Sequence, residues 1–268
     1  MHTKPITFAA ALVAIAAGGA LAQPIYLATS GSTLYRAEQG GAAMTFALSD
    51  EINNLVLAPN GDILAISGSE TGSGTFEIYR LVDALSNAPS LEIISDDLPN
   101  SYPAATFVGD TLYGYRNGSR MLVTYDIDAE VETEVGPSAP MQGPIGGAAY
   151  DAATDTFYAV TRGDDSLFTV DYAAGGGSPD ATLVGNLGID VFNMGLDLYA
   201  GTLYAAFEDT TNNQFVVGTL DTGTGMFTGD TVLFDGSLDG SVGFVVVPAP
   251  GVLAVFAAGG IFASRRRR

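Results

Sequence analysis

Five short apolar segments recur at similar intervals along the chain, and this repeat constrains the fold more than any other feature of the sequence. Four of the segments follow a tight turn rich in Gly, Asp or Asn, and the fifth is PIYLATS at 24–30. Equivalent positions in the five segments are Tyr26, Ala65, Tyr113, Tyr158 and Tyr204, separated by 39, 48, 45 and 46 residues. Helical periodicity is weak between them, so the pattern predicts repeated units of short antiparallel strands.

Each unit contains two further recognisable strands. The next strands are TLYRAE, TFEIYRL, MLVTYDI, SLFTVDY and QFVVGTL. The last strands are MTFAL, SLEIIS, ETEVG, ATLVG and TVLF. A period in the mid-forties with about four strands per unit is typical of a β-propeller blade. The sequence therefore predicts an all-β fold, a β-propeller with five blades; four or six blades and a curved sandwich are the alternatives.

The first and last units predict how the ring closes. The first unit lacks the strand that precedes the repeated segment in the others, and a spare strand, GFVVV at 243–247, follows the fifth unit. We expect this strand to pair with PIYLATS, because such pairing removes exposed sheet edges. The second unit is longer than the others, which predicts an insertion or a short helix near Val82–Ser86.

The charge is acidic and unevenly distributed. The chain has 30 acidic and 10 basic residues, and Lys4 and the four arginines of 265–268 lie in the terminal segments. The part between them holds five arginines and all 30 carboxylates, a net charge of −25. Such a body repels nucleic acid and anionic lipid headgroups, so no nucleic-acid partner is expected. It should attract divalent cations weakly.

The residue inventory excludes several kinds of chemistry. The chain has no cysteine, and its one histidine is His2. Disulfides, cysteine nucleophiles and Cys-ligated zinc are therefore impossible. A serine nucleophile would lack a histidine or lysine base in the central part of the chain. The sequence has no Gly-rich loop followed by Lys, which is the motif that would indicate a phosphate-binding site.

The first 22 residues have the features of a secretory signal. Lys4 precedes an apolar run from Ile6 to Ala17, and Ala20-Leu21-Ala22 forms an A-x-A ending. We expect export machinery and a signal peptidase to act here, so that the mature protein begins at Gln23. The alternative is an uncleaved membrane anchor.

The last residues form three elements in a fixed order. Val247-Pro248-Ala249-Pro250 is followed by the uncharged run 251–264 and by Arg265, Arg266, Arg267 and Arg268. As a helix the 14-residue run would be about 21 Å long, which is short of the roughly 30 Å hydrocarbon core. The arginines would remain in the cytoplasm. The sequence therefore predicts a C-terminal apolar helix that holds the exported body at the inner membrane, with a permanent single-span anchor as one reading.

This order of elements resembles the PEP-CTERM sorting signal of Gram-negative exosortase substrates. The resemblance covers about 22 residues, and it departs from the family motif at Ala249, where the family has glutamate. It implies that an exosortase-like protease cleaves the tail near the proline motif and that the body then reaches the cell surface or the extracellular matrix. The expected domains are therefore a signal peptide (1–22), a propeller-like domain (23–247), which resembles secreted bacterial propellers, and a sorting tail (248–268).

Carboxylate chemistry stays open in the predicted propeller. Some five-bladed propellers are glycosidases that use paired acids, and candidate acids near blade turns are Asp62, Asp110, Asp155 and Glu208. Turn preference alone also explains acids at these positions. The absence of tryptophan removes the usual platform for sugar stacking, although tyrosine can replace it.

Two further groups of residues could bind ions. Oxygen ligands for calcium cluster at 125–130, 151–156 and 235–240, but none of these segments matches an EF-hand, and each also reads as a β-turn. No cofactor is therefore expected beyond weak calcium binding. Arg116, Arg120 and Arg162 should form surface ion pairs, with a role in holding an anionic ligand as the alternative.

Two functions remain. The first is a non-enzymatic surface or matrix protein that binds a partner, such as an extracellular polysaccharide, or has a structural role. The alternative is a carboxylate-dependent glycoside hydrolase or another carbohydrate-active enzyme on the same fold. Convergent carboxylates and tyrosines in a central funnel would favour the enzyme, whereas a centre lined by Gly and Ala would favour binding or structure.

Overall fold

The computed structural model describes residues 23–68, 74–173, 179–238 and 240–249, and Gln23–Ala249 form one compact unit. The described residues contain twenty β-strands in five four-stranded antiparallel sheets. The sheets are the blades of a ring, and their strands are given from the centre outward. Blade 1 contains β20 (Val242–Val247), β1 (Ile25–Ser30), β2 (Thr33–Glu38) and β3 (Met44–Ala47), and blade 2 contains β4 (Ile52–Leu57), β5 (Ile63–Ser67), β6 (Phe76–Val82) and β7 (Ser90–Leu98). Blade 3 contains β8 (Ala104–Val108), β9 (Thr111–Tyr115), β10 (Met121–Asp126) and β11 (Val131–Pro137), blade 4 contains β12 (Ile145–Asp151), β13 (Thr156–Thr161), β14 (Ser166–Asp171) and β15 (Asp180–Asn186), and blade 5 contains β16 (Val191–Tyr199), β17 (Thr202–Asp209), β18 (Gln214–Leu220) and β19 (Phe227–Asp235).

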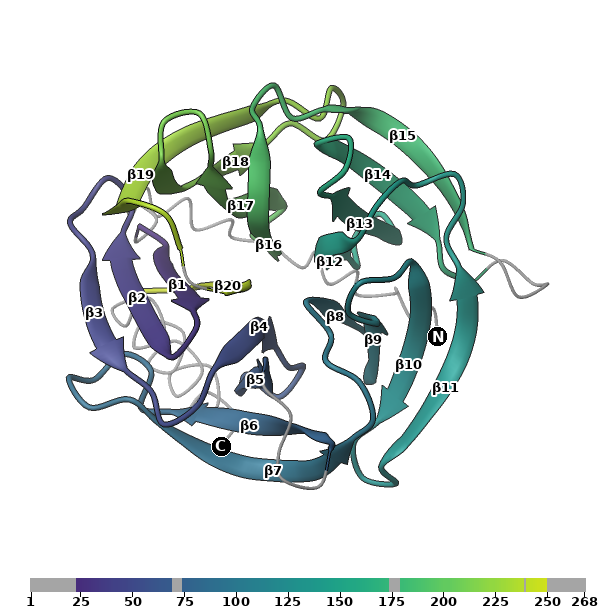
Figure 1. Ribbon diagram of the computed structural model, residues 1–268, viewed down its shortest axis with the longest axis horizontal. Helices are drawn as coiled ribbons and strands as arrows, with labels where there is room; N and C mark the ends of the chain where they lie inside the picture. Colours follow the sequence, from purple (N-terminus) through teal and green to yellow (C-terminus); the bar gives the residue numbers. More distant parts are fainter. Residues whose placement is uncertain (1–22, 69–73, 174–178, 239, 250–268) are drawn as a thin grey trace, which may run out of the picture. The chain divides into compact units, whose positions relative to one another are not determined.

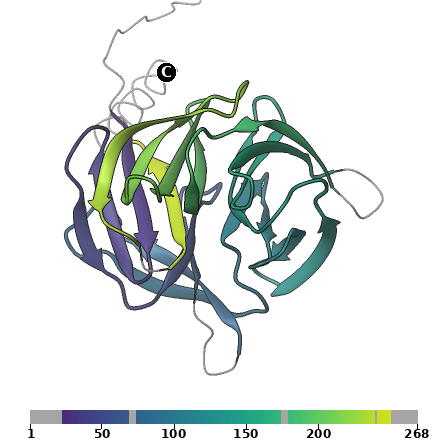
Figure 2. The same ribbon diagram turned by 45° about the horizontal axis from the view of Figure 1, so that its top comes forward.

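The five sheets form a ring in which the first strand of each blade is innermost (Figure 1). The fold is a five-bladed β-propeller, which confirms the blade number, and the strands assigned from the repeat take the second, third and fourth places in their blades. The closing strand β20 pairs with β1 over six residues, from Ile25↔Val247 to Ser30↔Val242. Figure 2 shows this strand beside the first strands of the chain. The expected closure is therefore confirmed.

Several aspartates have a structural role in the turns. Asp126, Asp151 and Asp221 each accept hydrogen bonds from backbone N–H groups two or three residues ahead. Such Asx turns replace water at backbone groups that have no strand partner. Between β1 and β2 the chain turns at Gly31, whose φ of 53° lies in the left-handed region that glycine adopts at little cost. Turn chemistry and strand alternation thus define each blade locally.

The core is divided among the blade junctions. Five clusters of buried apolar residues each join two neighbouring blades, so that every sheet is covered on both faces. The junction of blades 5 and 1 contains Tyr26 and Phe244 with ring centroids 6.2 Å apart. At the junction of blades 3 and 4, Tyr115 packs edge-on against Phe157 at 6.4 Å. Because each blade is buried only by its neighbours, the ring must close to complete the core.

The inner strands approach one another closely at glycines. A Cβ atom on Gly195 of β16 would lie 2.6 Å from the Cβ of Phe244 on β20. A Cβ on Gly243 of β20 would lie 2.7 Å from backbone atoms of Asn54 and Leu55 on β4. Neither position has room for a side chain, so these glycines permit the small radius of the ring.

The short helix expected near Val82–Ser86 is not formed. Strand β6 continues to Val82, and a turn follows in which Asp83 has a φ of 52°. The buried guanidinium of Arg36 donates hydrogen bonds to the carbonyl oxygens of Ala84, at 3.4 Å, and Ser86, at 2.6 Å. The carbonyls of a helical turn would point along its axis, whereas this turn presents two of them to one cation from the neighbouring blade.

Candidate functional site

The propeller has two faces that differ in which turns they carry. The first face holds the turns between the first and second strands of blades 2 to 5, at 58–62, 109–110, 152–155 and 200–201. The second face holds the described connections between the second and third strands of blades 1, 3, 4 and 5, at 31–32, 116–120, 162–165 and 210–213. All sheets run in the same order from the centre outward, so equivalent positions in the repeat lie on the same face.

A cleft of about 880 Å³ on the first face brings together two of the four candidate acids. Asp62 and Asp110 line it at the junction of blades 2 and 3, together with Asp126 and Asp128. Asp62 accepts a hydrogen bond from Arg80 Nε at 3.0 Å, and Asp126 caps the turn that follows β10. Asp62 and Asp126, two of the four carboxylates that line this cleft, therefore already accept hydrogen bonds from the protein.

The other two candidate acids lie elsewhere. Asp155 is in blade 4, where its carboxylate accepts hydrogen bonds of 2.7 Å from the hydroxyls of Tyr150 and Tyr172. These bonds lower the pKa of Asp155. Glu208 is at the far end of β17, on the second face. The sequence could have predicted that Glu208 lies on the other face. Asp62, Asp110 and Asp155 come just before the second strand of a blade, whereas Glu208 comes near the end of such a strand.

A polar group that the sequence analysis did not assemble lies on the second face, at the junction of blades 4 and 5. Arg162 follows β13, Phe192 and Asn193 are the second and third residues of β16, and Glu208 is the last but one of β17. Arg162 Nη2 donates to Asn193 Oδ1 at 3.3 Å, and Asn193 Nδ2 donates to Glu208 Oε2 at 2.6 Å. The backbone N–H of Leu238 donates to Glu208 Oε1 at 3.1 Å. The chain of hydrogen bonds crosses from one blade to the next.

Phe192 and Arg162 form the outer part of this group. The Arg162 guanidinium carbon lies 5.1 Å from the centroid of the Phe192 ring, and Phe192 is 56% exposed. Asn193 and Glu208 beneath them are 3% and 7% exposed. Phe192 is therefore an exposed aromatic ring beside a cation that makes one long hydrogen bond to the buried Asn193, which in turn contacts Glu208.

The burial of the Arg162 guanidinium is only partly offset by interactions with its neighbours. Burial lowers the pKa of Arg162, and the nearby Glu208 carboxylate acts in the opposite direction. Its Nε–H is buried and has no acceptor among the described residues. The described residues therefore give no ion pair at Arg162, and the expectation of one there stays a prediction. The long side chain of Arg162 lies between two blades, where no carboxylate comes within ion-pair distance in the part of the chain that the structure describes.

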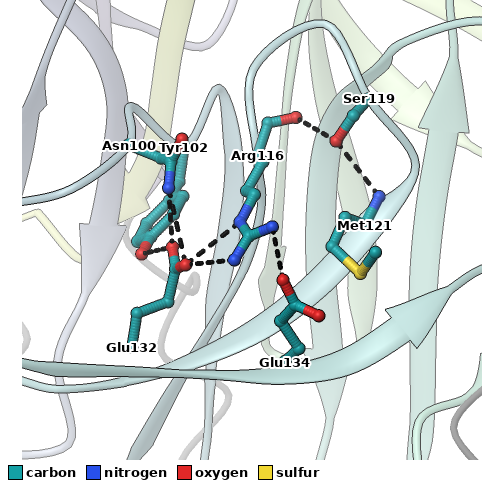
Figure 3. A network of polar contacts seen from close by, with 7 residues as sticks. All are labelled: Asn100, Tyr102, Arg116, Ser119, Met121, Glu132 and Glu134. Carbon is teal, nitrogen blue, oxygen red and sulfur yellow. Dashed lines mark hydrogen bonds and ion pairs between the residues drawn. The ribbon is translucent and has the colours of Figure 1, made fainter.

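Arg116 does form the expected ion pairs, although its principal partner is not at the surface. Glu132 Oε1 lies 2.5 Å from Arg116 Nη2, and Glu132 Oε2 accepts a 2.5 Å hydrogen bond from Tyr102 (Figure 3). Burial alone would raise the pKa of Glu132, but hydrogen bonds from Arg116, Tyr102 and Asn100 outweigh it and lower that pKa. Arg120 instead donates to the carbonyl oxygen of Met141 at 2.6 Å. Both arginines hold segments of blade 3 in place.

The three segments considered for calcium have structural roles where they are described. Asp126 and Asp151 accept hydrogen bonds within their own turns, and Gln214 donates to Asp235 at 2.8 Å. Among the described residues, no group of three or more His, Cys, Asp or Glu side chains is arranged to hold a metal ion. Weak calcium binding therefore stays a prediction.

Only part of the predicted processing residues is described. Gln23 is exposed before β1, and Pro248 and Ala249 follow β20, where Ala249 packs against the core at the junction of blades 1 and 2. Ala20, Ala22, Pro250 and the four arginines of 265–268 lie outside the described residues. No helix in the described ranges is long and apolar enough to cross a membrane.

Comparisons with known proteins identify the fold class and nothing narrower. No protein-family model matches the sequence, and no curated protein matches it. The structure is similar to a chain in the crystal structure of a nidogen/laminin complex, with a TM-score of 0.52, 12% identity and coverage of 82% of this chain and 98% of that chain. It is also similar to a structural-genomics protein of unknown function from Bacteroides thetaiotaomicron VPI-5482, with a TM-score of 0.50, 11% identity and coverage of 85% and 70%. An auxiliary nutrient binding protein from Bacteroides ovatus ATCC 8483 has a TM-score of 0.47, 14% identity and coverage of 81% and 69%. At their identities the first two similarities show the fold alone.

Proposed function

We propose that this protein is an exported propeller that is sorted to the cell surface through its C-terminal tail and acts there by binding rather than by catalysis. The sorting part rests on the signal-like residues 1–22 and on the Pro-x-Pro motif, apolar run and arginines at 248–268. An exosortase-like protease would remove the tail after export. Before processing, the tail would hold the body at the inner membrane.

The observation that carries the binding part is the distribution of the candidate acids. Asp62 and Asp110 share a cleft, Asp155 belongs to another blade, and Glu208 lies on the opposite face. A glycosidase needs two carboxyl groups about 5–10 Å apart on either side of one bond. Of the candidate acids only Asp62 and Asp110 share a cleft, and Asp62 is already paired with Arg80. The inner strands are also consistent with binding or structure, because they carry small residues, including Gly147, Gly195 and Gly243, where they approach one another.

The sorting proposal is tested by the intact mass of the protein recovered from each fraction of its native host. A surface or medium species that begins at Gln23 and ends within Pro248–Pro250 is the expected result. A species confined to membranes that still contains Arg268 would contradict sorting and would leave a permanently anchored propeller.

The glycosidase alternative has one specific test, because Asp62 and Asp110 do line the same cleft. The purified protein is incubated with a set of neutral polysaccharides, and reducing ends are measured. The binding role predicts no release above that of the buffer. Release that disappears in Asp110→Asn, with the fold unchanged by circular dichroism, would replace the binding role with hydrolysis at this cleft.

A further inference from the structure

The cleft of about 880 Å³ at the junction of blades 2 and 3 combines an apolar wall with an acidic edge. Its wall is the outer surface of the core at this junction and consists of Leu64, Ile94, Phe107, Leu112 and Ile127. Asp110, Asp126 and Asp128 line the same cleft and are exposed. The volume is in the range of pockets that bind small molecules. We infer that this cleft binds a linear aliphatic polyamine, a chain of methylene groups that carries two or more ammonium groups.

The charges of the lining favour a cation. Asp62 is paired at 3.0 Å with Arg80, the one basic residue that lines the cleft in the described part of the chain. The other three carboxylates of the lining form no ion pair with any described residue. Their charge is therefore not neutralised by the protein, and together with the acidic body it attracts cations and repels anions.

The positions of the carboxylates favour several separate positive charges over a single ion. They come from three different turns, those before β5, before β9 and after β10. Among the described residues, no three acidic side chains converge as a metal ion would require. The ammonium groups of a polyamine are separated by methylene groups, so they can meet carboxylates at different turns.

The apolar wall favours an aliphatic ligand. Methylene groups gain free energy when they leave water for an apolar surface, and a compact hydrated ion gains nothing from such a wall. Arg80 shows that the cleft accepts this kind of group. It lies opposite Leu64 in the pairing of β5 with β6, and its guanidinium reaches the carboxylates of Asp62 and Glu92 at 3.0 and 2.9 Å. An aliphatic stem with a charged end is the chemistry that a polyamine repeats.

The polyamine site rests on the proposed binding role, but its test is separate from those of sorting and hydrolysis. The full chain, in a nonionic detergent and at low ionic strength, is titrated by calorimetry with putrescine, spermidine and spermine. We expect the affinity to rise with the number of ammonium groups, to a Kd of about 0.1 mM or tighter for spermine.

A compact cation distinguishes the cleft from general attraction to the acidic body. Hexaamminecobalt(III) has the same charge as spermidine but no methylene groups. Because of the apolar wall, spermidine should bind at least about fivefold more tightly. Equal affinities would mean that charge alone attracts the ligand, and would overturn the site.

Two variants and a control locate the binding. Asp110→Asn and Asp128→Asn each remove one exposed charge from the cleft and should weaken the affinity for spermine by about two- to fivefold. The matched control is Asp235→Asn, at the exposed end of β19 in blade 5. It removes the same charge, keeps an oxygen that can accept from Gln214 and should leave the affinity unchanged.

Three further outcomes would overturn the polyamine site. Absence of spermine binding is the first, and an equal loss of affinity in the control and in the two cleft variants is the second. The third is tighter binding of N-acetylated, C-amidated tetralysine, which has the same charge as spermine, because it would assign the cleft to a basic segment of a partner protein. The masses that test sorting and the reducing ends that test hydrolysis do not depend on any of these results.

Discussion

Asp197 is a residue at which folding and ionisation oppose each other. It lies on the inner strand β16, and its carboxylate accepts hydrogen bonds from the backbone N–H groups of Val246, at 2.7 Å, and Leu198, at 2.8 Å. Burial raises the pKa of Asp197 to about 7, although both hydrogen bonds act against this shift. The carboxylate thus links β16 to the closing strand β20 in a site that disfavours its charge.

This shift predicts a pH dependence of stability. The folded-state pKa is above the unfolded value of 3.8, so the native state binds the proton more tightly. The free energy of unfolding should therefore decrease as pH rises from about 4 to about 7, by about 2–4 kcal/mol from this residue. Asp197→Asn keeps an oxygen that can accept from Val246 and should remove this contribution. Urea unfolding of both proteins at several pH values measures it, and parallel pH profiles would contradict the assignment.

At the scale of the elements, the inner strands approach one another most closely where they carry glycine. Gly195 places the backbone of β16 directly against β20, with Phe244 filling the space that a Cβ would need. Gly195→Ala should therefore destabilise the protein by about 1–3 kcal/mol, because an added methyl group forces two inner strands apart. Chemical unfolding followed by tyrosine fluorescence would measure the change.

Gly223→Ala is the matched control for this substitution. Gly223 lies in the turn between β18 and β19, and its nearest neighbour to an added Cβ is an Asp221 oxygen at 3.4 Å, an ordinary contact. Its effect should stay within about 0.5 kcal/mol. An equal loss of stability in the two variants would mean that the inner-strand contact is not the cause.

For the whole molecule, the closing strand should decide whether the ring folds cooperatively. All six residues of β20 are buried, and they belong to the junctions of blade 1 with both neighbours. A chain that ends after Ser241 lacks this strand and leaves β1 without a partner at the centre of the ring. We expect it to lose its cooperative thermal transition.

The comparison chain for this experiment ends after Ala249, the last residue of the compact unit. It should melt in one transition, close to that of the full chain. Calorimetry distinguishes the two truncations. A cooperative transition of normal enthalpy in the shorter chain would show that four complete blades and one incomplete blade are sufficient.

Much of this arrangement could be predicted because it is local. The positions Tyr26, Tyr113, Tyr158 and Tyr204 indicate the repeat since alternation and turn residues act over a few residues of chain. Closure by GFVVV followed from counting strands. Of the insertion or short helix predicted near Val82–Ser86, the helix was wrong because the carbonyls of Ala84 and Ser86 accept hydrogen bonds from Arg36 in another blade, a contact that no local pattern reports.

The sequence by itself indicated five blades without excluding four or six, and it determined the order of strands within each unit and the acidic character of the body, because these depend on periodicity, turn chemistry and composition. Only the tertiary structure decided which side chains meet across blades. It joined Arg162 to Asn193 and Glu208, placed Asp197 against Val246 and divided the candidate acids between two faces. The reason is physical: each of these contacts depends on how neighbouring sheets pack and on the radius at which the ring closes, and both are properties of the assembled blades.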